Sequence, residues 1–358
     1  MTSTTVADQA LYSDNKYQIR RARSNQEFRW PWWQNMIDLG WNRSDADLET
    51  FLNKPSGSSM LALIDSTASK DHQVCGHVAA LVNANKTGWF SLFVVNEVHR
   101  GIGMGGKLFS VAMDEFRKQG IEIVGLDGVA EQRQTYERRG FVSSPFGMVR
   151  VMTRPVLEKM PLTVEAAEMS GTFFNIYEIP LHLLAAHELR YTGFERPALW
   201  SNEYFFERDD VDGVALVRGG DLPQGVDDVR GWAIVRRCFQ GSRVGPLYAE
   251  SAEVAQAVLQ KAMELGGVDF ISGTYLANDP TPDNEHEDRD EWIVENGFMS
   301  AEIWDGNGEA VGVFQQAGWQ SSGVSLHRMW LNGNATPEFS AGGAAHTGVF
   351  AIFDASTG

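Results

Sequence analysis

The sequence is poor in cysteine: only Cys75 and Cys238 occur among its 358 residues. Two cysteines cannot form the disulfide framework of a small secreted domain, so we expect structural thiols in a reducing compartment. The chain also lacks an apolar run of membrane-spanning length, and its first residues, MTSTTVADQALYSDNK, lack a signal-peptide pattern. These absences predict a soluble, cytoplasmic protein with no membrane partner.

Positive charge is scarce as well. The chain has 30 Lys and Arg against 47 Asp and Glu, a formal net charge of −17. Proteins that wrap nucleic acid or dock on anionic lipid need clustered Lys and Arg, so neither partner is expected, and neutral or cationic small molecules fit better. A His/Cys/Asp/Glu cluster with metal-ligand spacing is also missing. His286, within DNEHEDRDE, is typical of a solvated acidic loop, and we expect no metal.

What the sequence does contain is a strand, a glycine-rich turn and a helix between Trp89 and Phe116. WFSLFVV predicts a buried strand, and apolar residues at helical spacing from Leu108 predict the helix. The turn between them spans Arg100 to Gly106. Backbone N–H groups at a helix N-terminus can hold a phosphate, and glycines let it approach closely. The alternative is that these glycines serve only the conformation of the turn.

The pattern Arg-x-x-Gly-x-Gly, formed by Arg100, Gly103 and Gly105, resembles the acetyl-CoA pyrophosphate loop of the GNAT superfamily of N-acetyltransferases. It lacks the Gly-Lys-Ser/Thr ending of a nucleotide loop. The resemblance implies acetyl-CoA as cosubstrate, held by this loop and by backbone at the splayed end of the central strand. The implied cofactor-binding residues are Phe93, Val94, Val95, Arg100, Gly101, Ile102, Gly103, Met104, Gly105, Gly106 and Lys107.

A second GNAT-like feature is Tyr136, four residues before Gly140-Phe141. A phenol near the sulfur can donate a proton to the departing thiolate, so Tyr136 is the candidate catalytic acid; alternatively it packs on the sheet. The acceptor amine must also lose a proton. Asp127 and Glu131 are the candidate bases, although an aspartate at a strand end commonly caps the next helix.

The candidate acceptor site lies in LGWNRSDADLETFL, where Trp41, Asn42 and Asp45 precede or begin a helix. This stretch resembles the acceptor-side helices of GNAT proteins that carry two such domains. The resemblance implies that these residues bind the substrate, with aromatic rings as a wall. The alternative is that the tryptophans belong to the core.

The pattern restarts in the second half, which is long enough to form a core of its own. Gly231 to Leu265 predicts a strand, a turn containing Gly245-Pro246, and an amphipathic helix, and VFQQAGW from Val313 echoes YERRGF. We therefore expect an α/β protein of two tandem GNAT-like domains, each a mixed, partly parallel twisted sheet flanked by helices. The expected organisation is a flexible N-terminus (1–16), an acetyl-CoA-binding domain (17–155), a linker (156–162) and a degenerate domain that shapes the acceptor site (163–358).

The second half departs from the family pattern in two ways. Its strand is not followed by Arg-x-x-Gly-x-Gly, and Phe314 stands where Tyr136 stands in the first half. These departures predict a single acetyl-CoA site. An acidic insertion, residues 278–309, carries Trp292 and Trp304 and is either a plain surface loop or a cover over the acceptor cavity.

The expected function is transfer of an acetyl or short acyl group from acetyl-CoA to a primary amine of a small molecule, polar or cationic, through a ternary complex. The chain is expected to be a monomer or homodimer. Two alternatives stay open: a CoA-sensing protein that has lost turnover, and a protein or peptide N-acetyltransferase.

Overall fold

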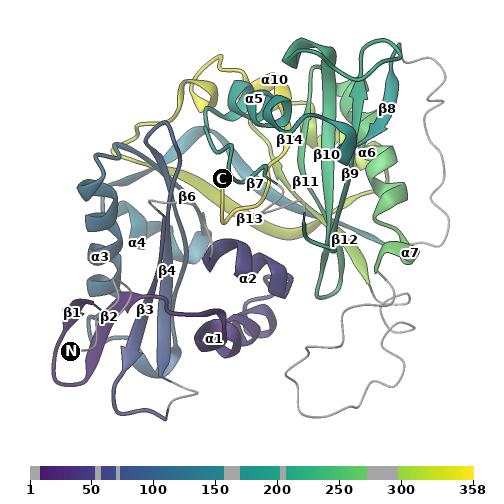
Figure 1. Ribbon diagram of the computed structural model, residues 1–358. Helices are drawn as coiled ribbons and strands as arrows, with labels where there is room; N and C mark the ends of the chain where they lie inside the picture. The colour runs from purple at the N-terminus through teal and green to yellow at the C-terminus, as the bar shows by residue number, and fades with distance from the viewer. Residues whose placement is uncertain (1–8, 53–57, 70–72, 157–169, 202–206, 272–296) are drawn as a thin grey trace. The chain divides into compact units, whose positions relative to one another are not determined.

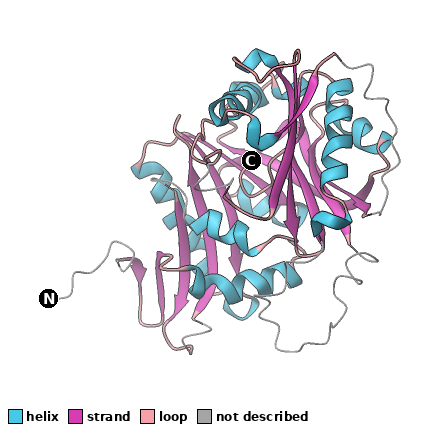
Figure 2. Ribbon diagram, turned by 45° about the vertical axis from the view of Figure 1, so that its right-hand side comes forward, coloured by secondary structure: helices cyan, strands magenta, loops and turns pink. Residues whose placement is uncertain are grey.

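The computed structural model describes residues 9–52, 58–69, 73–156, 170–201, 207–271 and 297–358 (Figure 1). By its internal contacts the chain divides into two compact units, residues 1–126 with Thr357 and residues 127–356 with Gly358. Both contain strands flanked by helices (Figure 2). This division concerns packing, and the predicted domain boundaries at residues 155 and 163 stay a prediction. The predicted linker residues 157–162 lie outside the described residues.

The first unit is a mixed sheet with strand order β1-β2-β3-β4-β5-β6. Neighbouring strands are antiparallel except β5 and β6, which are parallel and joined by helix α3, as the sequence predicts. Its elements are β1 (Ala10–Ser13), β2 (Tyr17–Arg21), α1 (Asn25–Asp38), α2 (Asp45–Leu52), β3 (Ser59–Asp65), β4 (Val74–Val82), β5 (Thr87–Val95), the 3-10 turn η3 (Glu97–His99), α3 (Met104–Lys118) and β6 (Ile123–Val129), which runs across the division.

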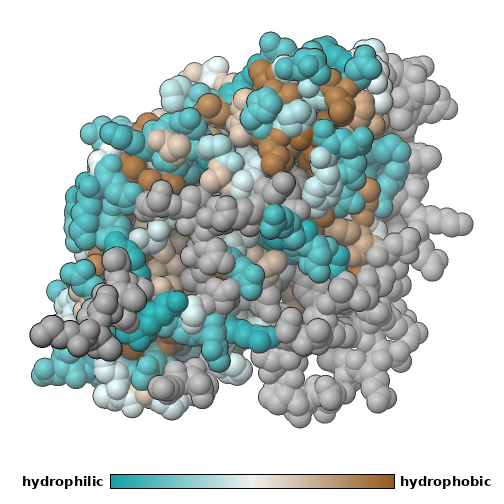
Figure 3. All heavy atoms as spheres, viewed as in Figure 1, coloured by the Kyte–Doolittle hydropathy of each residue, from teal (hydrophilic) through white to brown (hydrophobic). Residues whose placement is uncertain are grey.

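Helix α3 covers the sheet because its apolar residues fall on one face. Leu108, Phe109, Ala112, Met113 and Phe116 are all buried, at the spacing that the sequence shows. The hydrophilic residues of its outward side are visible in the space-filling view (Figure 3). Strand β3 is buried along its whole length, which explains its nearly continuous apolar run.

The second unit has strand order β13-β7-β12-β11-β10-β9-β8, with β14 paired to β11. Strands β11 and β12 are parallel, and helix α6 lies between them in the chain. Its elements are η4 (Ala130–Gln132), α4 (Arg133–Glu137), β7 (Phe141–Pro155), β8 (Thr172–Asn175), η6 (Ile176–Glu178), α5 (Leu181–Thr192), β9 (Val211–Val217), η8 (Val226–Asp228), β10 (Val229–Cys238), β11 (Gly241–Ala249), α6 (Ala252–Leu265), α7 (Val268–Ile271), β12 (Phe298–Trp304), α9 (Ala310–Gln316), β13 (Gln320–Leu331), η9 (Pro337–Phe339), α10 (Ala345–Gly348) and β14 (Val349–Ala351).

The order of elements repeats. The series β3, β4, β5, α3, β6, α4, β7 recurs as β9, β10, β11, α6, β12, α9, β13. The last helix of each series, α4 or α9, carries a buried aromatic residue, Tyr136 or Phe314. The residue four positions later is a glycine with positive φ, Gly140 (+90°) or Gly318 (+83°). Left-handed backbone favours glycine, which explains why this residue occurs in both copies.

Two local predictions are wrong. Gly245-Pro246 lies inside strand β11 instead of in a turn, and the turn between β10 and β11 falls at Phe239-Gln240. Proline is tolerated there because the β10–β11 register shifts opposite these residues. Asp127 lies within strand β6 and not at its end, because β6 continues to Val129.

Two buried histidines are neutral. Burial lowers the pKa of His77, in the first unit, and of His187, in the second, from 6.5 to about 4. In His187, Nδ1 accepts a hydrogen bond from Trp232 Nε1 at 3.1 Å, and Nε2 lies 3.0 Å from the carbonyl oxygen of Val229. This arrangement suits the neutral ring, whose Nε2–H donates to the carbonyl, and a second proton on Nδ1 would face the indole N–H.

Stability should therefore fall on acidification. The unfolded chain takes up a proton at each histidine near pH 6.5 and the folded chain only near pH 4, so the contribution is complete above pH 6.5 and is lost between these values. At pH 5 the loss amounts to about 2 kcal/mol for each histidine. His187→Gln, which offers a donor and an acceptor but cannot take up a proton, should remove the part of this pH dependence that is due to His187. Urea unfolding at pH 7.5 and 5 measures this, and an equal pH dependence in both proteins would contradict it.

Candidate active site

The predicted pyrophosphate loop begins α3. Its N-cap residue is Gly103, at φ +88°, and Gly101 is also left-handed at +79°. Gly103 has no side chain with which to cap the helix, so the first N–H groups of α3 are left for a ligand. A Cβ built on Gly101, Gly103 or Gly106 would meet open space among the described residues. The first two glycines are therefore needed for backbone conformation, and an anion has room to approach the loop.

Side chains near the loop hold it in place. Arg100 Nε donates to the carbonyl oxygen of Val95 at 2.7 Å, which ties the loop to the end of β5. The hydroxyl of Tyr17 lies 3.0 Å from Nδ1 of His99, the residue before Arg100. Lys107 Nζ lies 5.2 Å from the centre of the Tyr12 ring. The β1–β2 hairpin thus contacts the loop at both of its ends.

Strand β5 is bulged just before the predicted acyl-binding backbone. The pairing with β4 jumps from Ser91↔Ala79 to Val94↔His77, so two residues of β5 oppose one of β4. Leu92, in the bulge, has φ +51°, a conformation that costs about 1–2 kcal/mol for a residue other than glycine. β5 pairs with β6 only over Thr87–Trp89. The segment Phe93–Val95 is half-buried and lies beyond this pairing.

The predicted acceptor residues lie on or beside the helices of the first unit. Trp41, half-buried, packs edge-on against Trp32 and His77, with ring centroids 6.3 and 6.2 Å apart. Asn42 is buried and left-handed at φ +46°. Asp45 is the first residue of α2. Trp41 therefore has a structural contact with the core besides its predicted role in binding substrate.

Tyr136 and Glu131 belong to the second unit. The Tyr136 side chain in α4 is 8% exposed, and burial raises its pKa to about 12 against a smaller opposing effect of Arg139. The phenol is thus protonated at neutral pH, as a proton donor must be. Its ring packs edge-on against Phe141 at 6.3 Å. Glu131, in η4, is exposed.

Asp127 is engaged in a buried ion pair. Its carboxylate accepts hydrogen bonds from Arg328 Nε at 2.9 Å and Nη2 at 2.6 Å, and neither side chain is exposed. Burial raises the pKa of Asp127, while the guanidinium favours the ionised form. The Arg328 guanidinium also lies over the Phe339 ring, 4.6 Å from its centre. These contacts give the carboxylate a structural role, and its use as the general base stays a prediction.

In the second unit, a strand of the chain itself fills the gap between the parallel strands. β11 pairs with β12 over Gly241–Val244, and farther along its Leu247 and Tyr248 pair with β14. The Ile352 N–H, just after β14, donates to the Glu302 carbonyl of β12 at 2.9 Å. A Cβ on Gly245 would lie 2.6 Å from the Ile352 carbonyl oxygen, so this approach requires glycine. β14 therefore occupies the place that corresponds to the opening beyond Trp89 in β5.

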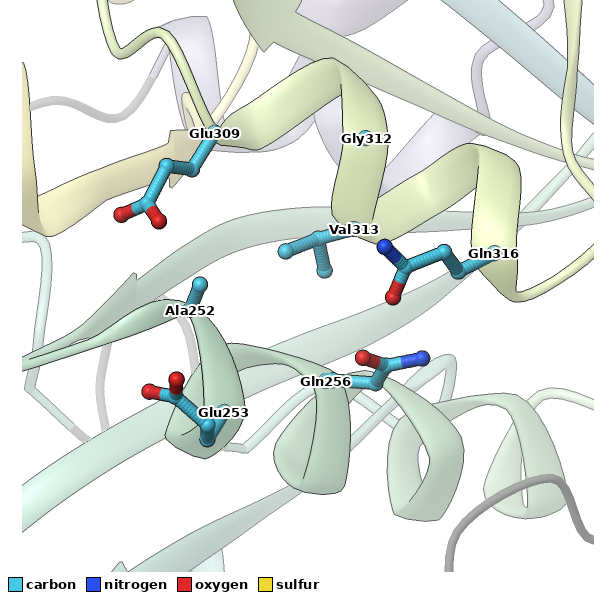
Figure 4. Close-up of a pocket in the computed structure, with 7 residues that line it drawn as sticks. All are labelled: Ala252, Glu253, Gln256, Glu309, Gly312, Val313 and Gln316. Carbon is cyan, nitrogen blue, oxygen red and sulfur yellow. The ribbon is translucent and has the colours of Figure 1, made fainter.

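The start of α6 also differs from the start of α3. Ser251 caps α6, its side chain accepting from the Val254 N–H at 3.3 Å, and Glu253 lies in the first turn. An open groove of about 420 Å³ lies between α6 and α9, lined by Ala252, Glu253, Gln256, Glu309, Gly312, Val313 and Gln316. Figure 4 shows the Glu253 and Glu309 carboxylates at one end of it and the two glutamines at the other. Two carboxylates and a filled N-cap disfavour a phosphate here.

Within the described residues, no group of three or more His, Cys, Asp and Glu could hold a metal ion, and His286 lies outside them. In the part of the chain that the structure describes, each helix is too short or too polar to cross a membrane. Most of the acidic insertion, including Trp292, lies outside the described residues. Trp304, in contrast, ends strand β12 and is fully buried, so it belongs to the core of the second unit.

Comparison with known proteins identifies the class. A sequence model described as the acetyltransferase (GNAT) family matches residues 23–141, and one described as an acetyltransferase (GNAT) domain matches residues 222–271. A relative named holothin acyltransferase, from Pseudoalteromonas sp. (strain SANK 73390), is 26% identical over 244 residues, covering 68% of this chain and 72% of the relative.

Solved structures share the fold. A Pyrococcus horikoshii protein assigned as an acetyltransferase superposes with a TM-score of 0.67 at 17% identity, over 97% of this chain and 98% of the other. A tandem GNAT protein from the clavulanic acid biosynthesis pathway superposes with a TM-score of 0.56 at 11% identity, over 90% and 100%. The two family-model matches make the chain a member of the GNAT superfamily of acyltransferases, and the superpositions show its fold. It is of the tandem type, with two GNAT-like domains.

Three features of the site were missed by sequence reasoning. Leu92 gives no sign of a left-handed conformation, because leucine rarely adopts one. His77 stands in an apolar stretch, GHVAA, which predicts only a strand. The pairing of β14 with β11 joins residues about a hundred positions apart, which local patterns do not report.

The ion pair of Asp127 yields a test of its role. Asp127→Asn leaves a buried guanidinium without its counter-charge, so the free energy of unfolding should fall by about 3–5 kcal/mol while kcat per folded molecule is kept. Asp354→Asn is the matched control, because Asp354 forms the buried pair with Arg236. If Asp127 were also the base, kcat per folded molecule would in addition fall by about 10²–10⁴-fold. Urea unfolding and steady-state kinetics separate the two outcomes.

Proposed function

We propose that this chain transfers an acetyl or short acyl group from acetyl-CoA to a primary amine of a small molecule, which is polar or cationic. The main support is the start of α3, where Gly101 and Gly103 are left-handed and no side chain of the N-cap residue occupies the helix N-terminus. Together with the splayed, bulged end of β5, this arrangement suits a pyrophosphate followed by an extended arm. Family membership supplies the reaction class, acyl transfer.

The proposed reaction is direct attack within a ternary complex. The amine nitrogen attacks the thioester carbonyl carbon, a C–N bond forms, the C–S bond breaks, and the sulfur leaves as a thiolate. Backbone N–H groups of Phe93–Val95 would stabilise the charge on the carbonyl oxygen. Tyr136 would give its proton to the thiolate, and the amine would lose one to Glu131 directly or through water. Trp41, Asn42 and Asp45 would position the amine.

One relative suggests a specific acceptor to test. It is named holothin acyltransferase, so we include holothin among the candidate acceptors. The net charge of −17 favours capture of a cationic or neutral amine over an anionic one.

A thiol-release screen tests the proposal. Acetyl-CoA and longer acyl-CoAs are offered with holothin, amino sugars, polyamines, amino acids, arylamines and peptides. We expect amine-dependent release of CoA with at least one small amine, and calorimetry should give one acetyl-CoA site per chain because β14 and Glu253 occupy the corresponding places in the second unit. Gly103→Glu should abolish both signals, since it puts a strained, negative residue against the pyrophosphate.

Gly120→Glu is the matched control for that substitution. Gly120 is also left-handed, at φ +65°, with open space around its Cβ position, but lies at the other end of α3. It should leave binding and turnover unchanged. Two equivalent acetyl-CoA sites would contradict the single-site proposal, and a full screen without turnover by a protein that binds acetyl-CoA would favour the sensing alternative.

The proposed role of Tyr136 is tested separately. Tyr136→Phe should lower kcat by about 10²–10⁴-fold, because the thiolate loses its proton donor, and should change CoA affinity little. Tyr191→Phe, at an equally buried tyrosine of α5, is the control and should keep kcat. Weaker CoA binding with normal turnover of the bound complex would show that Tyr136 serves packing. The time course of thiol release measures kcat, and calorimetry measures the affinity for CoA.

A further inference from the structure

A buried polar pair lies beside the β5 bulge. His77, on β4, is 1% exposed, and its Nε2 lies 2.7 Å from Nδ2 of Asn35 on α1. With the asparagine amide as donor, Nε2 accepts, and the neutral ring carries its proton on Nδ1. The ring also packs edge-on against Phe28 of α1 at 5.8 Å and against Trp41 at 6.2 Å. One imidazole thus contacts α1 and the segment that joins α1 to α2.

The same residue borders the bulge. His77 pairs with Val94, the first paired residue after Leu92, and Ala79 pairs with Ser91 before it. The Leu92 backbone lies close enough to oppose the effect of burial on the His77 pKa, although Nδ1 completes no hydrogen bond within the described residues. A strained residue such as Leu92 persists only when its surroundings hold it in place. His77 is the polar part of those surroundings.

His187 shows what an ordinary core histidine looks like in this protein. It is equally buried, and both of its ring nitrogens have hydrogen-bond partners in the core of the second unit. His77 differs because its Nδ1 completes no hydrogen bond among the described residues and has only the Leu92 backbone close by. A buried polar atom so poorly paired costs stability, and a hydrophobic side chain would fill the same space without that cost. The position of His77 between the β5 bulge and Trp41 suggests a role that compensates for this cost.

We propose that His77, held by Asn35, is a positioning residue that fixes the β5 bulge relative to Trp41, and thereby aligns the acyl-binding backbone with the acceptor. The inference rests on the proposed function for the roles of Phe93–Val95 and Trp41. The contacts themselves lie entirely within the first unit. A small displacement of either reactant away from attack geometry is enough to lower the rate by about 10–100-fold.

The test compares His77→Phe and Asn35→Ala with His187→Phe. The first keeps an aromatic ring and removes the hydrogen bond, the second removes the partner without touching the strand, and the third is the matched core control. Amide hydrogen exchange of the ligand-free protein is measured over Phe93–Val95. We expect faster exchange there in the first two variants, with exchange in β3 unchanged, and normal exchange over Phe93–Val95 in His187→Phe.

Kinetics give the second readout, with acetyl-CoA and holothin, or with the most active amine of the screen if holothin is not accepted. His77→Phe and Asn35→Ala should lower kcat about 10–100-fold and leave the Kd of CoA within twofold, whereas His187→Phe keeps kcat. Normal exchange and kcat in Asn35→Ala would overturn the proposal, even if His77→Phe fails to fold. Should the wild type turn over no amine, the proposed function fails, and the exchange data alone decide whether His77 holds the bulge.

Discussion

Two parallel strands that separate leave backbone N–H and C=O groups without partners, and this constraint organises both halves of the protein. Buried groups of this kind are almost always paired. In the second unit β14 supplies the partners, bonding to β11 on one side while the next residue bonds to β12 on the other. In the first unit β5 leaves β6 after Trp89, is bulged at Leu92 and ends half-buried. An extended ligand is the complement of such an edge, because it can make the same hydrogen bonds as a strand, and we propose that the arm of acetyl-CoA is this ligand.

The two copies therefore agree in the features that serve folding and differ in those that we propose to serve chemistry. The left-handed glycines Gly140 and Gly318 are kept because each chain reversal requires that backbone conformation. Each is preceded by a buried aromatic residue that packs on another aromatic residue five positions later, Tyr136 on Phe141 and Phe314 on Trp319. Only the first copy has a hydroxyl there. Packing needs just a ring at this position, which Phe314 supplies, whereas the proton donation that we propose for the first copy needs the phenol of Tyr136.

Sequence patterns predicted the elements whose cause is local. The α3 face follows from apolar residues at helical spacing, and the loop follows from glycines that must adopt left-handed backbone. The bulge at Leu92 escaped prediction because tertiary packing, not residue preference, imposes its conformation. Gly245 was assigned to a turn because glycine and proline mark turns, whereas the structure uses this glycine to let the Ile352 backbone approach a strand. The ion pair of Asp127 joins residues two hundred positions apart, so its structural role was also beyond local patterns.

Charge in the first unit bears on how a phosphate would be held. Although the loop carries Arg100 and Lys107, the arginine already donates to the Val95 carbonyl, and the lysine lies over Tyr12 beside Asp14, which interacts with it electrostatically. Both cations thus have contacts within the protein. In the proposed complex, the attraction for a pyrophosphate would come in large part from the N–H groups and dipole at the start of α3, a short-range interaction with fixed geometry. A strongly acidic protein can bind a polyanion in this way, because local donors aimed at the ligand outweigh the distant, screened charge of the remaining surface.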